Sequence, residues 1–188
     1  MSGAHGHVDG SNKRIALLIA VFALLLAIAE TMAKSAQTDA INSNVEASNL
    51  WAFFQARTIR QTVVRTAGEE LTFARDAAPE GPVREALTRQ ITAWRATADR
   101  WESEPATGEG RRELTERAKK AEAKRDKSYK RYHDFEIASA GFQIAIVLAS
   151  ATVITGAVSL AWIAGGLGIV GLAFTAIGLF SPGLIHLF

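Results

Sequence analysis

The sequence predicts an all-α membrane protein, with three transmembrane helices and an extended antiparallel helical stalk between the first and second spans. The chain contains no Asp, Glu, Lys, Arg or His from Ile137 to Phe180, and a second apolar run begins at Ile15. A spanning helix needs about 20 mainly apolar residues, so the first stretch is long enough for two crossings and the second for one. The charges lie between these runs. All but two of the 21 Lys and Arg residues, and all but two of the 19 Asp and Glu residues, fall between Lys34 and Glu136.

The composition excludes several kinds of site. The chain has no Cys, which rules out disulfides, thiolate zinc sites and cysteine nucleophiles. Its charged middle part is nearly neutral, whereas nucleic-acid binding usually needs a strongly basic face. No nucleophile, Gly-rich phosphate loop or HExxH spacing accompanies His133, Asp134 and Glu136. We therefore predict no catalytic residue, no cofactor, no bound metal and no nucleic-acid partner.

The N-terminal part is predicted to be a flexible leader (residues 1–14) followed by the first transmembrane helix (residues 15–33). His5 and His7 in the leader form a His-x-His pair, but a Gly-rich tail rarely organises a closed metal site. Basic residues before a short apolar run also describe a cleavable signal peptide, and we favour an anchor because the run ends in Glu-Thr-Met-Ala-Lys. Glu30 and Lys34 stand four residues apart, which predicts an interfacial ion pair. Glu30 is also the one acid that could enter the hydrocarbon region, where a carboxylate suggests an ion or proton site.

The C-terminal apolar run is predicted to form the second span (residues 137–158), the third span (residues 162–180) and a short tail (residues 181–188). We place a tight turn at 159–161, with Gly165 and Gly166 as the alternative. Small residues recur here at four-residue spacing, which lets membrane helices approach closely. The candidate helix-packing positions are Gly141, Ala145, Ala149, Ala164 and Gly168.

Residues 34–136 form the predicted stalk, with breaks near 79–82 and 104–110, where Pro and Gly gather. The first segment contains a stretch of weak helix propensity (residues 35–44) that could bend. The second segment carries one apolar stripe, namely Val83, Leu87, Ile91, Trp94, Ala98 and Trp101. The third carries a thin heptad seam, in which Arg125 and Ser128 interrupt Leu114, Ala118, Ala121, Tyr132 and Phe135. At about 1.5 Å per residue the first segment is nearly as long as the other two together, so we expect them to return along it.

The charges near the spans indicate an orientation. Three spans place the stalk and the C-terminus on one side of the membrane. Seven basic residues lie from Lys119 to Arg131, shortly before the second span, whereas only Lys13 and Arg14 precede the first. Because short cytoplasmic segments carry an excess of Lys and Arg, this distribution favours a cytoplasmic stalk.

The most distinctive local feature of the stalk is a group of large apolar residues near its start. Leu50, Trp51, Phe53 and Phe54 cover more than one face of a helix, and Gln55 adds a polar edge. Aromatic side chains are enriched at protein interfaces, so these five residues are a candidate interface. The alternative is that the rings pack onto the returning helices near Trp94, Trp101 and Tyr132.

Residues 46–61, with the sequence EASNLWAFFQARTIRQ, resemble a bacterial membrane family catalogued as domain of unknown function 4337. The most recognisable positions are Trp51, Phe54, Gln55, Ala56 and Ile59. Phe135-Glu-Ile-Ala and Gln143 to Ser150 resemble the entry into that family's second span. The resemblance covers nearly the whole chain, although the leader here has only two histidines. It implies a multi-pass protein of a bacterial inner membrane and brings no established activity.

These observations favour a non-enzymatic integral membrane protein that acts as a scaffold, assembly or accessory subunit through its stalk and spans. Its expected partners are the lipid bilayer and either further copies of itself or another membrane protein. The alternative is a small transporter or channel subunit that uses Glu30 and the Gly-rich third span. That alternative needs polar residues along a path through the bilayer, and apart from Ser and Thr the spans offer almost none.

Overall fold

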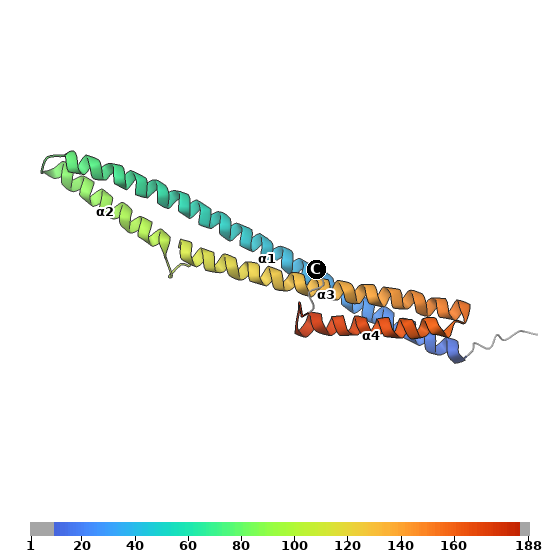
Figure 1. Ribbon diagram of the computed structural model, residues 1–188. Coiled ribbons are helices and arrows are strands. Elements are labelled where there is room, and N and C mark those ends of the chain that lie inside the picture. The colour runs from blue at the N-terminus through green and yellow to red at the C-terminus, as the bar shows by residue number, and fades with distance from the viewer. Residues whose placement is uncertain (1–9, 185–188) are drawn as a thin grey trace, which may run out of the picture. The chain divides into compact units, whose positions relative to one another are not determined.

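The computed structural model describes residues 10–184 and contains four α-helices, with no strand among those residues. In chain order they are α1 (Gly10–Ala77), α2 (Pro82–Glu102), α3 (Arg111–Thr155) and α4 (Val158–Phe180) (Figure 1). The predicted all-α class is therefore confirmed. Helices α1, α3 and α4 are each long and apolar enough to cross a membrane. Most of the predicted leader and the last residues of the predicted tail lie outside the described part of the chain.

Helix α1 runs for 68 residues, and residues 35–44 are helical throughout. The weak intrinsic propensity of this stretch is overcome by packing. Buried small residues recur every three or four positions along it, namely Ala29, Ala33, Ala36, Ala40, Ser43 and Ala47. Burial of one helical face supplies most of the stability of helices in proteins, so this stripe keeps the stretch helical.

The predicted breaks of the stalk lie where Pro and Gly placed them. Residues 78–81 separate α1 from α2; Gly81 has a φ of 146° and Pro82 occupies the first turn of α2. Residues 103–110 separate α2 from α3, and Gly108 has a φ of 68°. Both glycines adopt backbone conformations that are costly for other residues.

The turn before the last helix lies earlier than predicted. Helix α3 ends at Thr155 and α4 begins at Val158, so neither 159–161 nor Gly165 and Gly166 form the turn. Gly156 has a φ of 72°, and its amide donates to the carbonyl of Thr152 at 2.9 Å. A glycine in the left-handed conformation is the usual end of a helix, and this signal outweighs the later small residues.

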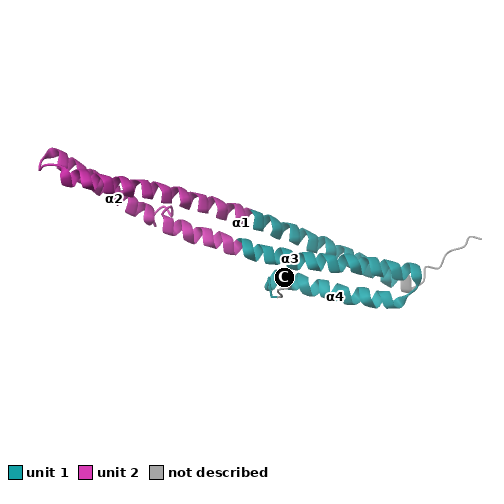
Figure 2. Ribbon diagram, turned by 45° about the horizontal axis from the view of Figure 1, so that its top comes forward, with its two compact units in different colours: residues 1–41, 125–188 teal, residues 42–124 magenta. Residues whose placement is uncertain are grey.

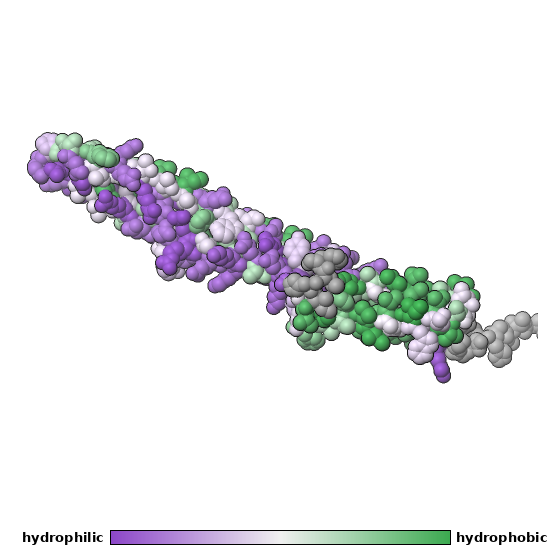
Figure 3. Space-filling view, viewed as in Figure 1, coloured by the Kyte–Doolittle hydropathy of each residue, from purple (hydrophilic) through white to green (hydrophobic). Residues whose placement is uncertain are grey.

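The chain divides into two compact units, shown in Figure 2. Unit 1 comprises residues 1–41 and 125–188, and unit 2 comprises residues 42–124. On the face seen in Figure 3, hydrophobic side chains predominate over unit 1 and hydrophilic side chains over unit 2. The apolar runs at 15–33 and 137–180 thus belong to unit 1, and most of the charged stalk belongs to unit 2.

In unit 2 the later helices return along α1, as the lengths predicted. Ala47 and Leu50 of α1 pack with Leu114 and Ala118 at the start of α3. Further along α1, the Gln61 side chain reaches the carbonyl of Ala98 in α2. The stripe of α2 is partly buried at Leu87, Trp94 and Trp101 and fully buried at Ile91 and Ala98, whereas Val83 is 65% exposed. The seam predicted for the start of α3 is confirmed by the burial of Leu114, Ala118 and Ala121.

Candidate functional site

The interior of unit 1 is built from aromatic rings that enter a glycine face of α4. Gly168 faces the ring of Phe22 in α1, Gly171 faces Phe142 in α3, and Gly178 faces Phe135. A Cβ atom at Gly171 would lie 2.8 Å from the Phe142 ring, which is closer than carbon atoms can approach. The glycines therefore serve to admit the rings and hold the three helices together.

The predicted packing residues lie in or beside this interior. Ala145, Ala149 and Ala164 are completely buried in one cluster with Phe22 and Phe142, and Gly168 is buried as well. Gly141 is half-buried; a Cβ there would lie 3.5 Å from the carbonyl oxygen of Leu167 and 3.6 Å from the Cα of Gly171 in α4. Sequence spacing found these positions but missed Gly171 and Gly178, which lie three and ten residues after Gly168. Their partners are rings on another helix, which the spacing on α4 cannot reveal.

Glu30 and Lys34 line a groove of about 450 Å³ on the surface of unit 1, together with Gln37, Tyr132, Glu136 and Gln143 among others. The predicted ion pair between Glu30 and Lys34 is not present among the described residues. Instead, the Gln143 side chain donates to Glu30 Oε1 at 3.2 Å. The exposed carboxylate meets an amide from α3, and this contact replaces a pairing within its own helix.

Across the same groove, the Tyr132 hydroxyl donates to Glu136 Oε1 at 3.0 Å. This hydrogen bond to a carboxylate, assisted by partial burial, raises the pKa of Tyr132. The groove thus brings together two carboxylates, one ammonium group and two amide side chains. These are ordinary ligands for polar headgroups, but all of them are partly solvated.

A buried carboxylate of α3 forms a hydrogen bond with the segment that follows α4. Asp134 is 3% exposed, and its Oδ2 accepts a hydrogen bond from the Gly183 amide at 3.2 Å. Arg131 donates to the carbonyl of Gly178 at 3.3 Å. Asp134 therefore acts in chain packing, and neighbouring His133 lies exposed beside Glu136 at 3.5 Å.

In unit 2 the aromatic group near the start of the stalk faces α3. The Trp51 indole nitrogen donates to Glu122 at 2.8 Å, and its ring meets Phe54 edge-on at 5.5 Å between centroids. The rings of Phe53 and Phe54 each lie beneath a guanidinium group, Arg57 at 5.3 Å and Arg111 at 5.0 Å. Cation–π contacts of this kind hold rings in fixed positions.

These contacts divide the five residues of the candidate interface. Leu50 is only 7% exposed and belongs to the core, while Trp51, Phe53 and Phe54 are half-buried against it. The rings pack onto a returning helix, as the alternative predicted, at a cluster that contains Leu114, Ala118 and Ala121 of α3. Gln55 alone among the five is exposed, because its position in α1 turns it away from α3.

A network of polar side chains, here called the polar clamp, fixes the α2–α3 break onto α1. It consists of Arg57, Gln61, Glu102, Glu109 and Arg111. Gln61 is 2% exposed; its amide nitrogen donates to the Ala98 carbonyl at 2.8 Å and to Glu102 at 3.1 Å, and its oxygen accepts from Arg111 at 2.7 Å. Arg111 also pairs with Glu102 at 2.8 Å, and Arg57 pairs with Glu109 at 2.6 Å.

Sequence reasoning missed the polar clamp, although a signal was available. Arg57 and Gln61 follow Leu50 by seven and eleven residues, so they continue the buried face of α1 with polar side chains. A polar residue at a buried position needs partners, and buried charges are paired in folded proteins. The partners lie 37 to 52 residues away in the chain, and only the return of α2 and α3 brings them there.

Glu113, in the first turn of α3, stabilises the segment between α2 and α3. Its carboxylate accepts from the Ser103 hydroxyl at 2.7 Å and from the Glu104 amide at 3.1 Å. These two hydrogen bonds lower the pKa of Glu113, and the bond from Gln61 together with nearby Arg111 lowers the pKa of Glu102. Gly110 is buried in the same turn, where a Cβ would lie 2.7 Å from the Cα of Ser103.

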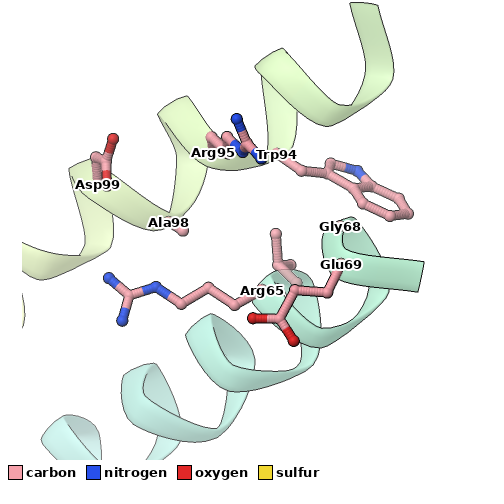
Figure 4. Close-up of a pocket in the computed structure, with 8 residues that line it drawn as sticks. Arg65, Gly68, Glu69, Trp94, Arg95, Ala98 and Asp99 are labelled. Atoms are coloured by element: carbon pink, nitrogen blue, oxygen red, sulfur yellow. The ribbon is translucent and has the colours of Figure 1, made fainter. Parts of the chain in front are cut away.

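A shallow groove of about 280 Å³ lies between α1 and α2 in unit 2. Figure 4 shows Trp94 lying over α1 near Gly68, with Arg65 extending between the two helices toward Asp99. Charges of both signs line the groove, namely Arg65, Glu69, Arg95 and Asp99. Their mixture gives the groove no preference for anions or cations.

The described residues contain no group of three or more His, Asp or Glu side chains that could hold a metal ion. His5 and His7 of the leader lie outside the described residues. Two of the polar side chains that are buried in unit 1 are satisfied locally: Ser139 and Thr152 each donate to the carbonyl four residues earlier, at 2.9 and 3.0 Å. The contacts of both units therefore serve helix association.

No curated protein and no solved structure matches the chain. A family model does match, over residues 11–181, and so spans all four helices. That stretch includes the residues 46–61 segment, the polar clamp and the glycine face of α4. The chain belongs to the family described as a domain of unknown function, DUF4337.

Proposed function

We propose that this chain is a three-span integral membrane protein that serves as a non-enzymatic scaffold, assembly or accessory subunit. The observation that carries the proposal is helix α1, which continues without a break from an apolar segment into the polar clamp. Helix α1 therefore contributes an apolar segment to unit 1 and a packed polar segment to unit 2. The polar clamp, the cation–π contacts and the hydrogen bonds of Glu113 add stiffness at the α2–α3 break, where the helices of unit 2 would otherwise hinge.

The composition and the exposed surface of the three apolar helices support the proposed membrane location. In the most apolar 18-residue stretches of α1, α3 and α4, only 11%, 39% and 22% of the residues are buried. Most of these apolar residues therefore face outward. An exposed apolar surface of this extent is unusual for a protein in water and suits lipid. We place the protein in a bacterial inner membrane, with the stalk and C-terminus in the cytoplasm, on the strength of the basic residues before the second span.

The test is native mass spectrometry of the complex released from native membranes in a gentle detergent. A stoichiometric foreign protein would identify an accessory or assembly subunit and its pathway, and a homo-oligomer would identify a self-assembling scaffold. A bare monomer, obtained under conditions that preserve known complexes of the same membrane, would contradict the proposal.

The transporter or channel alternative rests on the Glu30–Gln143 contact, a polar contact between side chains of two candidate spans. The glycine face that would line its path is filled by Phe22, Phe142 and Phe135. Ion flux in vesicles that contain the purified protein, abolished by Glu30→Gln, would favour this alternative over a scaffold.

A further inference from the structure

Helix α1 carries a second stripe of apolar and small residues on the face opposite its packed face. We name it the outer stripe and define it as Val45, Ser48, Ala52, Ala56, Ile59 and Val63. All six residues are exposed; Val45 is 52% exposed, Ile59 64% and Val63 61%. Over the same turns the packed face holds Ser43, Ala47, Leu50, Arg57 and Gln61. The two stripes are displaced by two residues, which is about 200° around the helix. Helices that pack on one stripe therefore cannot contact the other stripe.

The spacing of the outer stripe suits a partner helix. Its members follow one another at three, four, four, three and four residues, which is 18 residues in five turns. This matches the 3.6-residue turn of a straight α-helix, so the stripe stays on one line. The positions directly beside its middle, Asn49 and Gln55, are uncharged, and Arg60 stands further round the helix. In a stalk that is dense in charge, a line of small and apolar residues of this length is what one helix presents to another.

The sizes of the side chains indicate how the partner helix lies. Ser48, Ala52 and Ala56 form the middle of the stripe, and the branched residues Val45 and Ile59 lie at equal distances on either side of Ala52. Two helices that cross at an angle are closest at one point and separate from it in both directions. Small residues at the crossing and larger ones outward match that geometry, and Ser or Ala at four-residue spacing permits the close approach.

We propose that the outer stripe is where two copies of this chain cross at Ala52, with their stalks running in the same direction. In a symmetric pair with parallel helices each residue faces its own copy, so any charge in the stripe would face an identical charge. The outer stripe contains none. Its one polar member, Ser48, is compatible with facing itself, because a hydroxyl both donates and accepts a hydrogen bond. This inference rests on the proposed membrane location, because identical chains insert into one bilayer with the same orientation and their stalks then run parallel.

An antiparallel crossing at Ala52 would also match the side chains of the outer stripe, but it is incompatible with both chains lying in one bilayer. It would place Val45 against Ile59, and Ser48 against Ala56, which is an equally good match. It would also bring residues 71–77 of one chain beside residues 27–33 of the other, which end the first span predicted from the sequence (residues 15–33). Two copies in the same bilayer cannot adopt that register, so the parallel crossing is the arrangement we assign.

Disulfide cross-linking of the full chain in its native membrane tests the proposal. The chain has no Cys, so every introduced thiol is unique. A disulfide requires Cα atoms about 4.4–6.8 Å apart, which the crossing point satisfies best. Under a mild oxidant we expect Ala52→Cys to form a covalent dimer in most molecules and Ile59→Cys to form less. The matched control is Glu46→Cys, which is exposed on another face of α1 and should stay monomeric.

A mixing experiment settles the direction. Chains with Val45→Cys and chains with Ile59→Cys, coexpressed and distinguished by mass, should give few mixed dimers if the stalks are parallel. Mixed dimers in excess of either pure dimer would show an antiparallel pair and overturn the assignment.

A disruptive variant separates this inference from the proposed function. Ala52→Glu places a charge on an exposed position, so helix content should stay unchanged while the dimer is reduced at least tenfold. If Ala52→Cys cross-links no better than Glu46→Cys while native mass spectrometry still shows a complex, the outer-stripe dimer is wrong and the scaffold proposal stands. If no complex of any kind is found, both are wrong.

Discussion

The polar clamp predicts that one amide side chain holds the α2–α3 break onto α1, and Gln61→Ala tests this directly. The substitution removes three hydrogen bonds, at 2.8, 3.1 and 2.7 Å, two of them to charged groups. A neutral hydrogen bond contributes about 0.5–1.5 kcal/mol and one to a charged group about 1.5–3 kcal/mol. Glu102 and Arg111 still pair with each other at 2.8 Å, so part of the stabilisation by the polar clamp is retained in the variant. We expect the free energy of unfolding to fall by about 2–4 kcal/mol.

The assay is thermal unfolding of the purified full chain in detergent, followed by far-ultraviolet circular dichroism. Hydrogen exchange locates the change, and we expect faster exchange in residues 98–113 and unchanged exchange in α4. The matched control is Gln90→Ala in α2, an exposed amide in the same unit, which should have little effect. Equal unfolding temperatures and equal exchange in the two variants would refute the claim that the polar clamp fixes the break.

Three further predictions follow from individual contacts. Gly168→Ala should lower the free energy of unfolding by about 1–3 kcal/mol, because the added methyl group meets the Phe22 ring. Gly166→Ala, whose methyl group meets nothing within 4 Å, should raise the free energy of unfolding by about 0.5–1 kcal/mol. Equal unfolding temperatures of the two variants in detergent would contradict the packing of the Phe22 ring on Gly168. Ser43→Ala should stabilise the chain by about 1–2 kcal/mol, measured in the same way, because the Ser43 hydroxyl is buried without a hydrogen-bond partner among the described residues. The folded-state pKa of Glu113 is below its ordinary value of 4.5, so its contribution to stability is present above pH 4.5 and is lost as the pH falls through the lower folded-state pKa. The protection of residues 103–110 from hydrogen exchange, relative to the intrinsic rate at each pH, should therefore fall over that acidic range, and Glu113→Gln should weaken the dependence.

Much of the helix layout could be predicted because it depends on local chemistry. The clusters of Pro and Gly near 79–82 and 104–110 end helices, and the long apolar runs require helices that satisfy their own backbone. The heptad seam at the start of α3 was visible from spacing alone. The predicted continuation of the first helix through residues 35–44 is confirmed. The misplaced turn came from a competing local signal, because Gly156 ends α3 before the predicted position.

The sites were less predictable, because each combines residues from distant parts of the chain. Trp51, Phe53 and Phe54 indicated an interface, but the sequence could not say that α3 covers them while the opposite side of α1 stays open. Glu30 was paired with Lys34 by spacing, and its actual partner, Gln143, lies 113 residues away. Spacing along one helix reveals faces and does not reveal which other helix meets them.

By itself the sequence determined the helical class, the three apolar segments and the positions where the stalk must break, since all of these follow from side-chain chemistry and helical period. Tertiary structure alone decided which of the two stripes of α1 is packed and which is open. It also decided that buried Gln61 bonds to Glu102 and Arg111 and that Arg57 pairs with Glu109 through one terminal nitrogen. The physical reason is that burial and hydrogen bonding depend on distances through space, and these are fixed only when α2 and α3 return along α1.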